Sequence, residues 1–164
     1  MTLLASDIMQ RRVVTVSSDM PLSAVAALLF RERIGGAPVV ESSAEGRGRV
    51  VGIISLMDLT RFPLYRNAVA GVVDDYVRDL AAADGIGGVE PLPAPVLEEL
   101  SAHTAGDAMA AAPLCVDAGT PVRDVARAMV ARHLHRVLVM NGEELAGVIS
   151  SLDLVRVVAE GRDL

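Results

Sequence analysis

The hydrophobic positions of the chain follow one order of patterns in its first third and repeat that order in its last third. A short apolar run of strand type comes first. A stretch with apolar residues at helical spacing follows, then two more strand-type runs, and then the start of a second helix. The strand-type runs lie at 13–16, 37–40 and 50–54 in the first third, and at 114–116, 137–140 and 146–149 in the last. The pattern predicts two β-α-β-β-α units of the α+β class, each with a small sheet covered on one face.

The first helix of each unit follows a proline, at Pro21 and at Pro121. Proline suits the first turn of a helix, because the N–H that it lacks would have no partner inside the helix. Thr120 is placed to cap the second of these helices. The apolar positions are spaced by three and four residues and predict one buried face on each helix. They are Leu22, Val25, Ala26 and Leu29 in the first helix, and Val122, Val125, Ala126 and Met129 in the second.

The two units also repeat each other residue by residue. Residues 52–59, GIISLMDL, return as residues 147–154, GVISSLDL. Earlier matches, such as Asp7 with Asp107, are offset by 100 residues, and matches from Gly52 onward are offset by 95. A longer polar connection at 41–49 accounts for the change, since its counterpart is the Asn141-Gly142 pair, a strong signal for a tight hairpin. The duplication implies two similar half-modules that pack on each other and two similar sites.

A segment of about 40 residues joins the two repeats. Its residues 67–83 carry apolar positions at helical spacing, and the glycine-rich stretch 84–88 ends that pattern. Three prolines follow, at 91, 93 and 95, and predict an extended stretch. Such a segment is either a linker or a lid or partner-binding element. We expect its apolar helical face to pack on the module or on a dimer mate, because an exposed face of that kind would be a liability.

The composition restricts the partners that the chain can have. Hydrophobic residues make up 52% of the 164 residues, but there are only two Phe, two Tyr and no Trp, so the core is aliphatic. Few aromatic residues argue against single-stranded nucleic acid, which binds by base stacking. A net charge of −6 argues against a broad contact with phosphate backbones. We therefore expect no nucleic-acid partner.

The remaining bulk features suggest a soluble cytoplasmic protein. The N-terminus has no pattern of a secretory signal, and no run of about 18 apolar residues is present, so we expect no membrane partner. One cysteine, Cys115, excludes an intramolecular disulfide and a cysteine-based zinc site. Its apolar neighbours predict a buried strand residue rather than a reactive thiol.

A serine followed three residues later by an aspartate marks the same junction from strand to helix in both repeats, as Ser55 with Asp58 and Ser150 with Asp153. Two interpretations are open. In the first, the serines are helix N-caps and the aspartates complete the first turn, where the helix dipole favours negative charge. In the second, the junction binds a ligand: the helix N-terminus attracts phosphate, and the carboxylate accepts hydrogen bonds from ribose hydroxyls.

A cationic cluster, His133-Leu134-His135-Arg136, enters a strand of the second repeat. It is either a solvated helix end, whose charges suit the dipole, or an anion clamp, in which arginine gives forked hydrogen bonds to phosphate. The corresponding stretch of the first repeat, 33–36, ends in Gly35-Gly36, which would leave space rather than supply charge.

No arrangement of residues predicts catalysis or a metal site. There is no Gly-x-Ser-x-Gly segment, and the three histidines lack the spacing of a zinc motif. The paired carboxylates at 74–75 and 98–99 look like solvated faces. The sequence therefore predicts that the chain is not an enzyme and has no metal or catalytic cofactor.

Taken together, these residues resemble the CBS domain, named from cystathionine β-synthase, present as a tandem pair. The resemblance covers about 7–61 and 107–160 and leaves the connecting segment unmatched. It rests on the order, spacing and duplication of short pieces. These are Asp7-Ile8-Met9 with Thr15-Val16, the Pro21 helix, Pro38-Val39-Val40 and 52–58 in the first repeat, and Asp107-Ala108-Met109, the Pro121 helix, 135–139 and 147–153 in the second. The expected division is repeat 1 at 1–65, a connecting segment at 66–102 and repeat 2 at 103–164.

The resemblance implies a pair of repeats related by a pseudo-two-fold axis, with two clefts between them. It also implies a regulatory, non-catalytic module that binds AMP, ADP, ATP or a related adenosyl ligand. A homodimer and an unidentified regulated protein are the partners that it implies. The alternative is a ligand-free dimerisation or interaction scaffold that regulates a partner protein.

Site residues carried over by position have three implied roles. Asp58 and Asp153 resemble ribose ligands, and Ser55 and Ser150 resemble contacts to phosphate or ribose. His135 and Arg136 are similar to a phosphate-binding pair in the γ subunit of AMP-activated protein kinase. Thr15 and Val16 resemble part of a base pocket, and the remaining implied nucleotide-binding residues are Gly36, Ala37 and Val116. The chain departs from the family pattern at Cys115, Leu138 and Gly35-Gly36, so the two sites are expected to differ in affinity.

Overall fold

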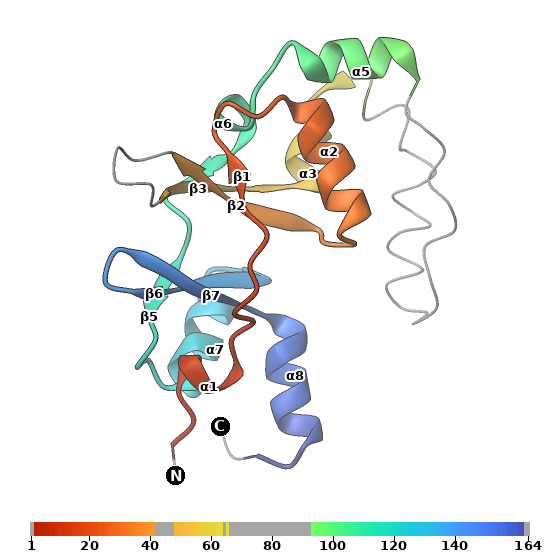
Figure 1. Ribbon diagram of the computed structural model, residues 1–164. Helices are drawn as coiled ribbons and strands as arrows, with labels where there is room; N and C mark the ends of the chain where they lie inside the picture. The colour runs from red at the N-terminus through yellow and green to blue at the C-terminus, as the bar shows by residue number, and fades with distance from the viewer. Residues whose placement is uncertain (1, 42–47, 64, 66–92, 163–164) are drawn as a thin grey trace. The chain divides into compact units, whose positions relative to one another are not determined.

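The computed structural model describes residues 2–41, 48–63, 65 and 93–162 of the chain (Figure 1). No helix in these ranges has the length and hydropathy needed to cross a membrane. The elements of the first part are α1 (Ala5–Ile8), β1 (Val16–Ser17), α2 (Leu22–Arg31), β2 (Gly36–Glu41), β3 (Arg49–Ser55) and α3 (Leu56–Leu59). The elements of the second part are α5 (Ala94–Ser101), α6 (Ala105–Ala108), β4 (Ala110–Ala111), β5 (Cys115–Asp117), α7 (Val122–Ala131), β6 (Arg136–Asn141), β7 (Glu144–Ser150) and α8 (Ser151–Ala159).

The strands form two small sheets, in the orders β1-β2-β3-β4 and β5-β6-β7. In the second sheet, β5 pairs parallel with β6, and β6 pairs antiparallel with β7. Each repeat therefore runs strand, helix, strand, strand, helix, as β1-α2-β2-β3-α3 and β5-α7-β6-β7-α8. The predicted α+β class and the β-α-β-β-α order are confirmed.

The predicted tight hairpin joins β6 to β7. Asn141 pairs with Glu144, so that Gly142 and Glu143 form a two-residue loop. Gly142 has a φ of +61°, in the left-handed region that glycine enters at little cost. The Asn-Gly signal in the sequence thus reflects a backbone requirement of the turn.

The buried helix faces also follow the predicted spacing. All four predicted positions of α2 are buried. In α7, three of the four are buried, and Ala126 is only partly covered. The α7 face packs in an aliphatic cluster with residues of the adjoining strands and one residue of α1. This cluster consists of Ala5, Val125, Met129, Val137, Val139 and Ile149.

The contacts divide the chain into two compact units that are not consecutive in sequence. The first unit consists of Met1–Thr15, Val40–Val51 and Ala111–Leu164, and the second of Val16–Val39 and Gly52–Ala110. Helix α1, which lies before β1 of the first repeat, therefore groups with the elements of the second repeat. Helices α5 and α6, which lie before β5 of the second repeat, group with elements of the first.

These exchanged helical segments supply backbone partners for the helices that follow proline. In one unit, the N–H of Leu22 donates to the carbonyl of His103 at 2.9 Å. In the other, the N–H of Val122 donates to the carbonyl of Leu3 at 2.9 Å. The cap predicted at Thr120 is wrong: the N-cap of α7 is Pro121, without a side-chain cap. A carbonyl from a distant segment satisfies the N–H group that a local side chain was expected to satisfy.

The predicted extended stretch after Pro91 is also wrong in its later part. Helix α5 begins at Ala94, with Pro93 as its N-cap and Pro95 within its first turn. Proline is tolerated there because the first N–H groups of a helix have no intrahelical partner. Helix α5 contacts α2, and the hydroxyls of Ser23 and Ser101 share a hydrogen bond of 2.8 Å. The helix predicted at 67–83 lies outside the described residues.

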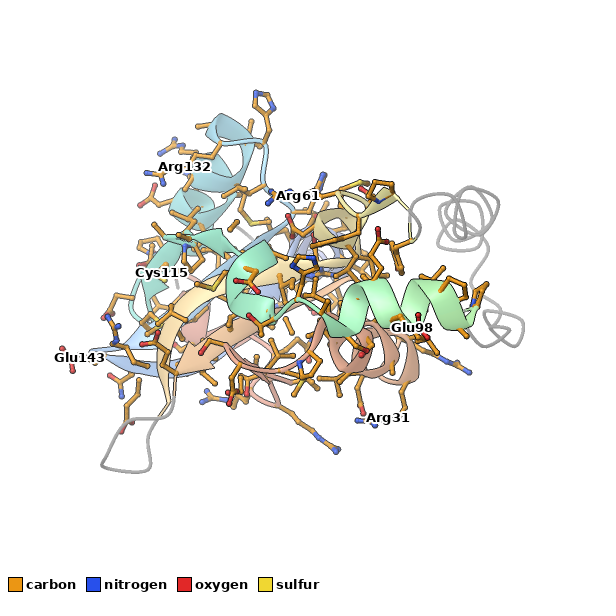
Figure 2. The ribbon with its side chains drawn as sticks, turned by 90° about the horizontal axis from the view of Figure 1, so that it is seen from above. Arg31, Arg61, Glu98, Cys115, Arg132 and Glu143 are labelled. Atoms are coloured by element: carbon orange, nitrogen blue, oxygen red, sulfur yellow. The ribbon has the colours of Figure 1, made fainter. Side chains whose placement is uncertain are left out.

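Two expectations for the strand at the start of each repeat need correction. In the first repeat, Val16 is the only residue of the predicted run 13–16 that belongs to a strand, β1 (Val16–Ser17). Residues 13–15 form no strand, and the chain passes from one compact unit to the other between Thr15 and Val16. In the second repeat, Cys115 is exposed rather than buried, because β5 is an edge strand (Figure 2). Partial burial still raises the pKa of the Cys115 thiol, which disfavours a reactive thiolate.

Candidate functional site

At the two junctions from strand to helix, β3 to α3 and β7 to α8, the serine donates the same two hydrogen bonds to its aspartate, and at the second junction the N–H of Asp153 also donates to the hydroxyl of Ser150 at 3.4 Å. The N–H and hydroxyl of Ser55 donate to Oδ2 of Asp58 at 2.8 and 2.7 Å. The N–H and hydroxyl of Ser150 donate to Oδ2 of Asp153 at 2.8 and 2.6 Å. Both junctions are reciprocal capping boxes, so the N-cap interpretation is confirmed. In each aspartate, Oδ2 accepts the hydrogen bonds from the serine, and Oδ1 can accept from another donor.

An arginine three residues after each aspartate interacts with Oδ1. Arg61 lies 3.3 Å from Asp58 Oδ1, and Arg156 lies 3.7 Å from Asp153 Oδ1. Both arginine side chains are largely exposed, so these ion pairs contribute little to stability. Arg61, labelled in Figure 2, also donates to the carbonyl of Ala108 at 3.3 Å. The repeat comparison aligns the two arginines, but sequence reasoning gave them no role.

The aspartates differ in one further contact. The side-chain amide of Gln10 donates to Oδ1 of Asp153 at 2.8 Å. The position 100 residues after Gln10 is Ala110, whose methyl group cannot donate a hydrogen bond. Accordingly, the side chain of Asp153 is 6% exposed and that of Asp58 is 17% exposed. Sequence reasoning missed Gln10, although a comparison of the two repeats contains the signal.

Acid should weaken the fold partly through Asp153. Burial raises the pKa of this carboxyl, but hydrogen bonds from Ser150 and Gln10 and the charge of Arg156 outweigh it, so the pKa lies below its ordinary value. A carboxyl with a lowered folded-state pKa contributes stability above its unfolded pKa, and this is lost as pH falls through the folded pKa. We expect the free energy of unfolding in urea to fall from about pH 4 downward. The fall should be smaller in Asp153→Asn, and equal pH dependence in both proteins would contradict this assignment.

The cationic residues of the second repeat lie beside its junction. Arg136 is the first residue of β6 and pairs in register with Ser150. The carbonyl of His135 accepts from the N–H of Ser151 at 3.0 Å. His135 is exposed and Arg136 is partly buried. The structure therefore gathers His135, Arg136, Ser150 and Asp153 around the start of α8.

Glycines occupy the matching place in the first repeat. The carbonyl of Gly35 accepts from the N–H of Leu56 at 3.2 Å. A Cβ atom on Gly36 would lie 2.8 Å from the carbonyl oxygen of Ile54. Gly36 is therefore required by the close approach of β3, whatever space it leaves for a ligand. The structure brings Gly36, Ser55 and Asp58 together, without a cationic side chain at the start of the strand.

The other predicted site residues are mostly covered. Val16 is 1% exposed and Ala37 is fully buried, so these side chains offer little surface to a ligand. Val116 is partly buried and packs against the aliphatic cluster around α7. Thr15 is exposed. Within the described part of the chain, no three His, Cys, Asp or Glu side chains are grouped so as to hold a metal ion.

Solved structures with similar folds include CBS-domain proteins. The CBS domain of a CBS domain-containing membrane protein from Sphaerobacter thermophilus superposes with a TM-score of 0.68 at 24% identity, covering 94% of this chain and 87% of that one. CBSX2 in complex with AMP gives 0.66 at 20% identity, covering 96% of both chains. The CBS domain pair of protein MJ0100, in complex with 5′-methylthioadenosine and S-adenosyl-L-methionine, gives 0.65 at 19% identity, covering 99% of this chain and 100% of that one. Among curated proteins, none matches this sequence.

The family model supports the same conclusion from the sequence side. The model of the CBS domain matches the chain twice, at residues 5–65 and at residues 105–160, which together make up more than half of its length. Each match contains one complete β-α-β-β-α repeat and one of the two capping boxes. The chain therefore belongs to the CBS domain family and carries two copies of the domain in tandem.

Proposed function

We propose that this chain is a non-catalytic regulatory module that binds adenine nucleotides or a related adenosyl ligand. The binding free energy would favour one conformation of the module, and a partner protein would respond to the change in population. A homodimer is part of the proposal. The main support is the pair of capping boxes, which place an aspartate carboxylate at the same point of each repeat.

Asp58 supplies the strongest single observation. Its Oδ2 atom is held by Ser55, while among the residues that the structure describes Oδ1 has the exposed Arg61 as its partner, at 3.3 Å. A carboxylate held in this way has a fixed orientation and keeps acceptor capacity. Carboxylates in nucleotide-binding folds use that capacity for ribose hydroxyls. Asp58 is therefore our proposed ribose acceptor of the first repeat, and Asp153 that of the second.

The second repeat also offers cationic groups for phosphate. Arg136 begins β6 opposite Ser150, and His135 precedes it. An arginine guanidinium gives short, charge-assisted hydrogen bonds to phosphate oxygens. The first repeat has Gly35 and Gly36 at the corresponding place. A nucleotide held at the second junction would thus gain more from its phosphates than one held at the first.

The ligands of two similar structures support the choice of an adenosyl compound. One was solved with AMP, and the other with 5′-methylthioadenosine and S-adenosyl-L-methionine. All three compounds contain adenosine, and they differ in charge and in the group at the 5′ position. A module that recognises adenosine through its ribose hydroxyls and base would accommodate this variety.

A panel of ligands tests the proposal. We expect AMP, ATP or S-adenosylmethionine at millimolar concentration to raise the melting temperature, because a ligand that binds only the folded state stabilises it by mass action. Adenosine and inorganic phosphate as separate ligands show which part of the nucleotide contributes. If AMP, ATP, S-adenosylmethionine and NAD all leave the melt unchanged, the nucleotide proposal fails.

The scaffold function would then take its place. Helix α8 carries three apolar side chains with large exposed fractions, 65% for Leu152, 59% for Val155 and 61% for Val158. They lie three residues apart and so share one helix face. An exposed apolar face of this kind is typical of a contact surface for a second copy of the chain or for a regulated partner.

A further inference from the structure

The two proposed ribose acceptors accept the same pair of hydrogen bonds from their serines and differ in a neighbouring side chain. Gln10 donates its amide to Oδ1 of Asp153 at 2.8 Å. At Asp58, the corresponding neighbour is Ala110, and the described residues provide Oδ1 with no amide donor. In the second repeat, Oδ1 of the proposed ribose acceptor therefore already accepts a hydrogen bond from a side-chain amide of the protein.

The backbone shows that Gln10 and Ala110 are equivalent in space as well as in sequence. Gln10 exchanges two backbone hydrogen bonds with Val148 of β7, at 2.9 and 3.1 Å. A Cβ on Gly147 would lie 2.9 Å from the carbonyl oxygen of Gln10. A Cβ on Gly52 would lie at the same 2.9 Å from the carbonyl oxygen of Ala110. Each residue is thus fixed beside the strand that leads into its capping box.

We propose that Gln10 is a built-in competitor for the ribose-binding carboxylate of Asp153 and makes the two nucleotide sites unequal. The inference rests on the proposed function. A ligand hydroxyl that approaches Oδ1 of Asp153 competes with the Gln10 amide for the lone pairs of that oxygen, so the new hydrogen bond forms at the expense of an existing one. A ligand hydroxyl that approaches Asp58 displaces no amide. The site of the first repeat therefore fills first, and the second binds a nucleotide chiefly through its phosphates.

The side chain of Gln10 is suited to this role. The residue is exposed, so its amide returns to water when a ligand takes its place, and no buried group is left without a partner. Asp153, in contrast, is almost fully buried and needs a donor whenever the site is empty. Gln10 satisfies that need in the absence of ligand.

Exchanging the two residues tests the inference. In the Asp58→Ala background, only the site at Asp153 remains, and calorimetric titration with AMP measures it alone. Adding Gln10→Ala should raise its affinity about tenfold, since a hydrogen bond to a charged acceptor contributes at least that factor. In the Asp153→Ala background, the reciprocal change Ala110→Gln should lower the affinity of the site at Asp58 about tenfold. Ala110 is exposed, so the longer side chain has room.

The outcomes separate the inference from the proposed function. An affinity gain with Gln10→Ala together with a loss with Ala110→Gln supports the competitor role. Unchanged or weaker AMP binding by the Gln10→Ala protein, while the wild-type chain still binds AMP, overturns that role and leaves the nucleotide proposal in place. No AMP binding by the wild-type chain and by any variant overturns both.

Discussion

The Asp58→Ala variant is expected to lose the tighter of the two adenine-nucleotide sites, with an affinity for AMP that falls about tenfold or more. The substitution removes a charged acceptor, and a hydrogen bond to such an acceptor contributes about 1.5–3 kcal/mol. Asp153→Ala should have a smaller effect on the first equivalents bound, because its carboxylate already accepts from Gln10. Isothermal titration calorimetry measures both affinities.

The control for this experiment concerns the capping box. Asp58 also holds the start of α3, so the variant loses a cap, at a cost of about 0.5–2 kcal/mol in the free energy of unfolding. Asp107→Ala disrupts the corresponding box of α6, in which Thr104 donates to Asp107, and leaves both proposed ribose acceptors in place. Melting curves without ligand show how far each variant is destabilised. If Asp58→Ala binds AMP as tightly as the wild-type chain, Asp58 is not a ribose ligand.

A second large effect is expected on stability, from a single methyl group on Gly147 or Gly52. A Cβ on Gly147 would lie 2.7 Å from Sδ of Met9 and 2.9 Å from the carbonyl oxygen of Gln10. A Cβ on Gly52 would meet Met109 and the carbonyl oxygen of Ala110 in the same way. A methionine side chain can move aside, but the Gln10 carbonyl is held by its hydrogen bond from Val148.

Each of these alanine variants should therefore lose about 1–3 kcal/mol in the free energy of unfolding, the usual cost of overpacking. For a chain of this size, that corresponds to a melting temperature lower by several degrees, at about 2–4 °C for each kcal/mol. Urea denaturation gives the free energy directly. Gly119→Ala is the matched control, because its Cβ would meet only the Oδ1 atom of Asp117, at 3.2 Å. If the Gly52→Ala and Gly147→Ala variants unfold with the same free energy as the wild-type chain, the close approach at these glycines is relieved at no cost in stability.

The features that the sequence predicts well are local ones. The helix faces of α2 and α7 follow from the spacing of apolar residues, and the hairpin at Gly142 follows from the turn that it must make. The capping boxes also lie within four consecutive residues, Ser55 to Asp58 and Ser150 to Asp153. In each case, the interacting groups are neighbours in the chain, so their spacing carries the information.

The features that the sequence did not predict depend on distant segments. Thr120 was expected to cap α7, but the carbonyl of Leu3 satisfies the first N–H of that helix. Gln10 reaches Asp153 across a separation of 143 residues. Cys115 was expected to be buried because its neighbours are apolar, whereas its exposure follows from the edge position of β5. The local sequence pattern does not show which strand lies at the edge of a sheet. It also does not show which distant segment supplies a hydrogen-bond partner to the end of a helix.

The exchange of the helical segments that precede the repeats determines what a break in the chain would do. A cut within 66–92 would divide the protein into an N-terminal and a C-terminal fragment. The first compact unit would then hold α1 from one fragment beside α7 and α8 from the other, and the second would hold α2 from one beside α5 from the other. Both fragments would contribute to both hydrophobic cores. Each compact unit is thus completed by segments from both sides of the connecting segment, so neither fragment on its own would contain all the helices and strands of either unit.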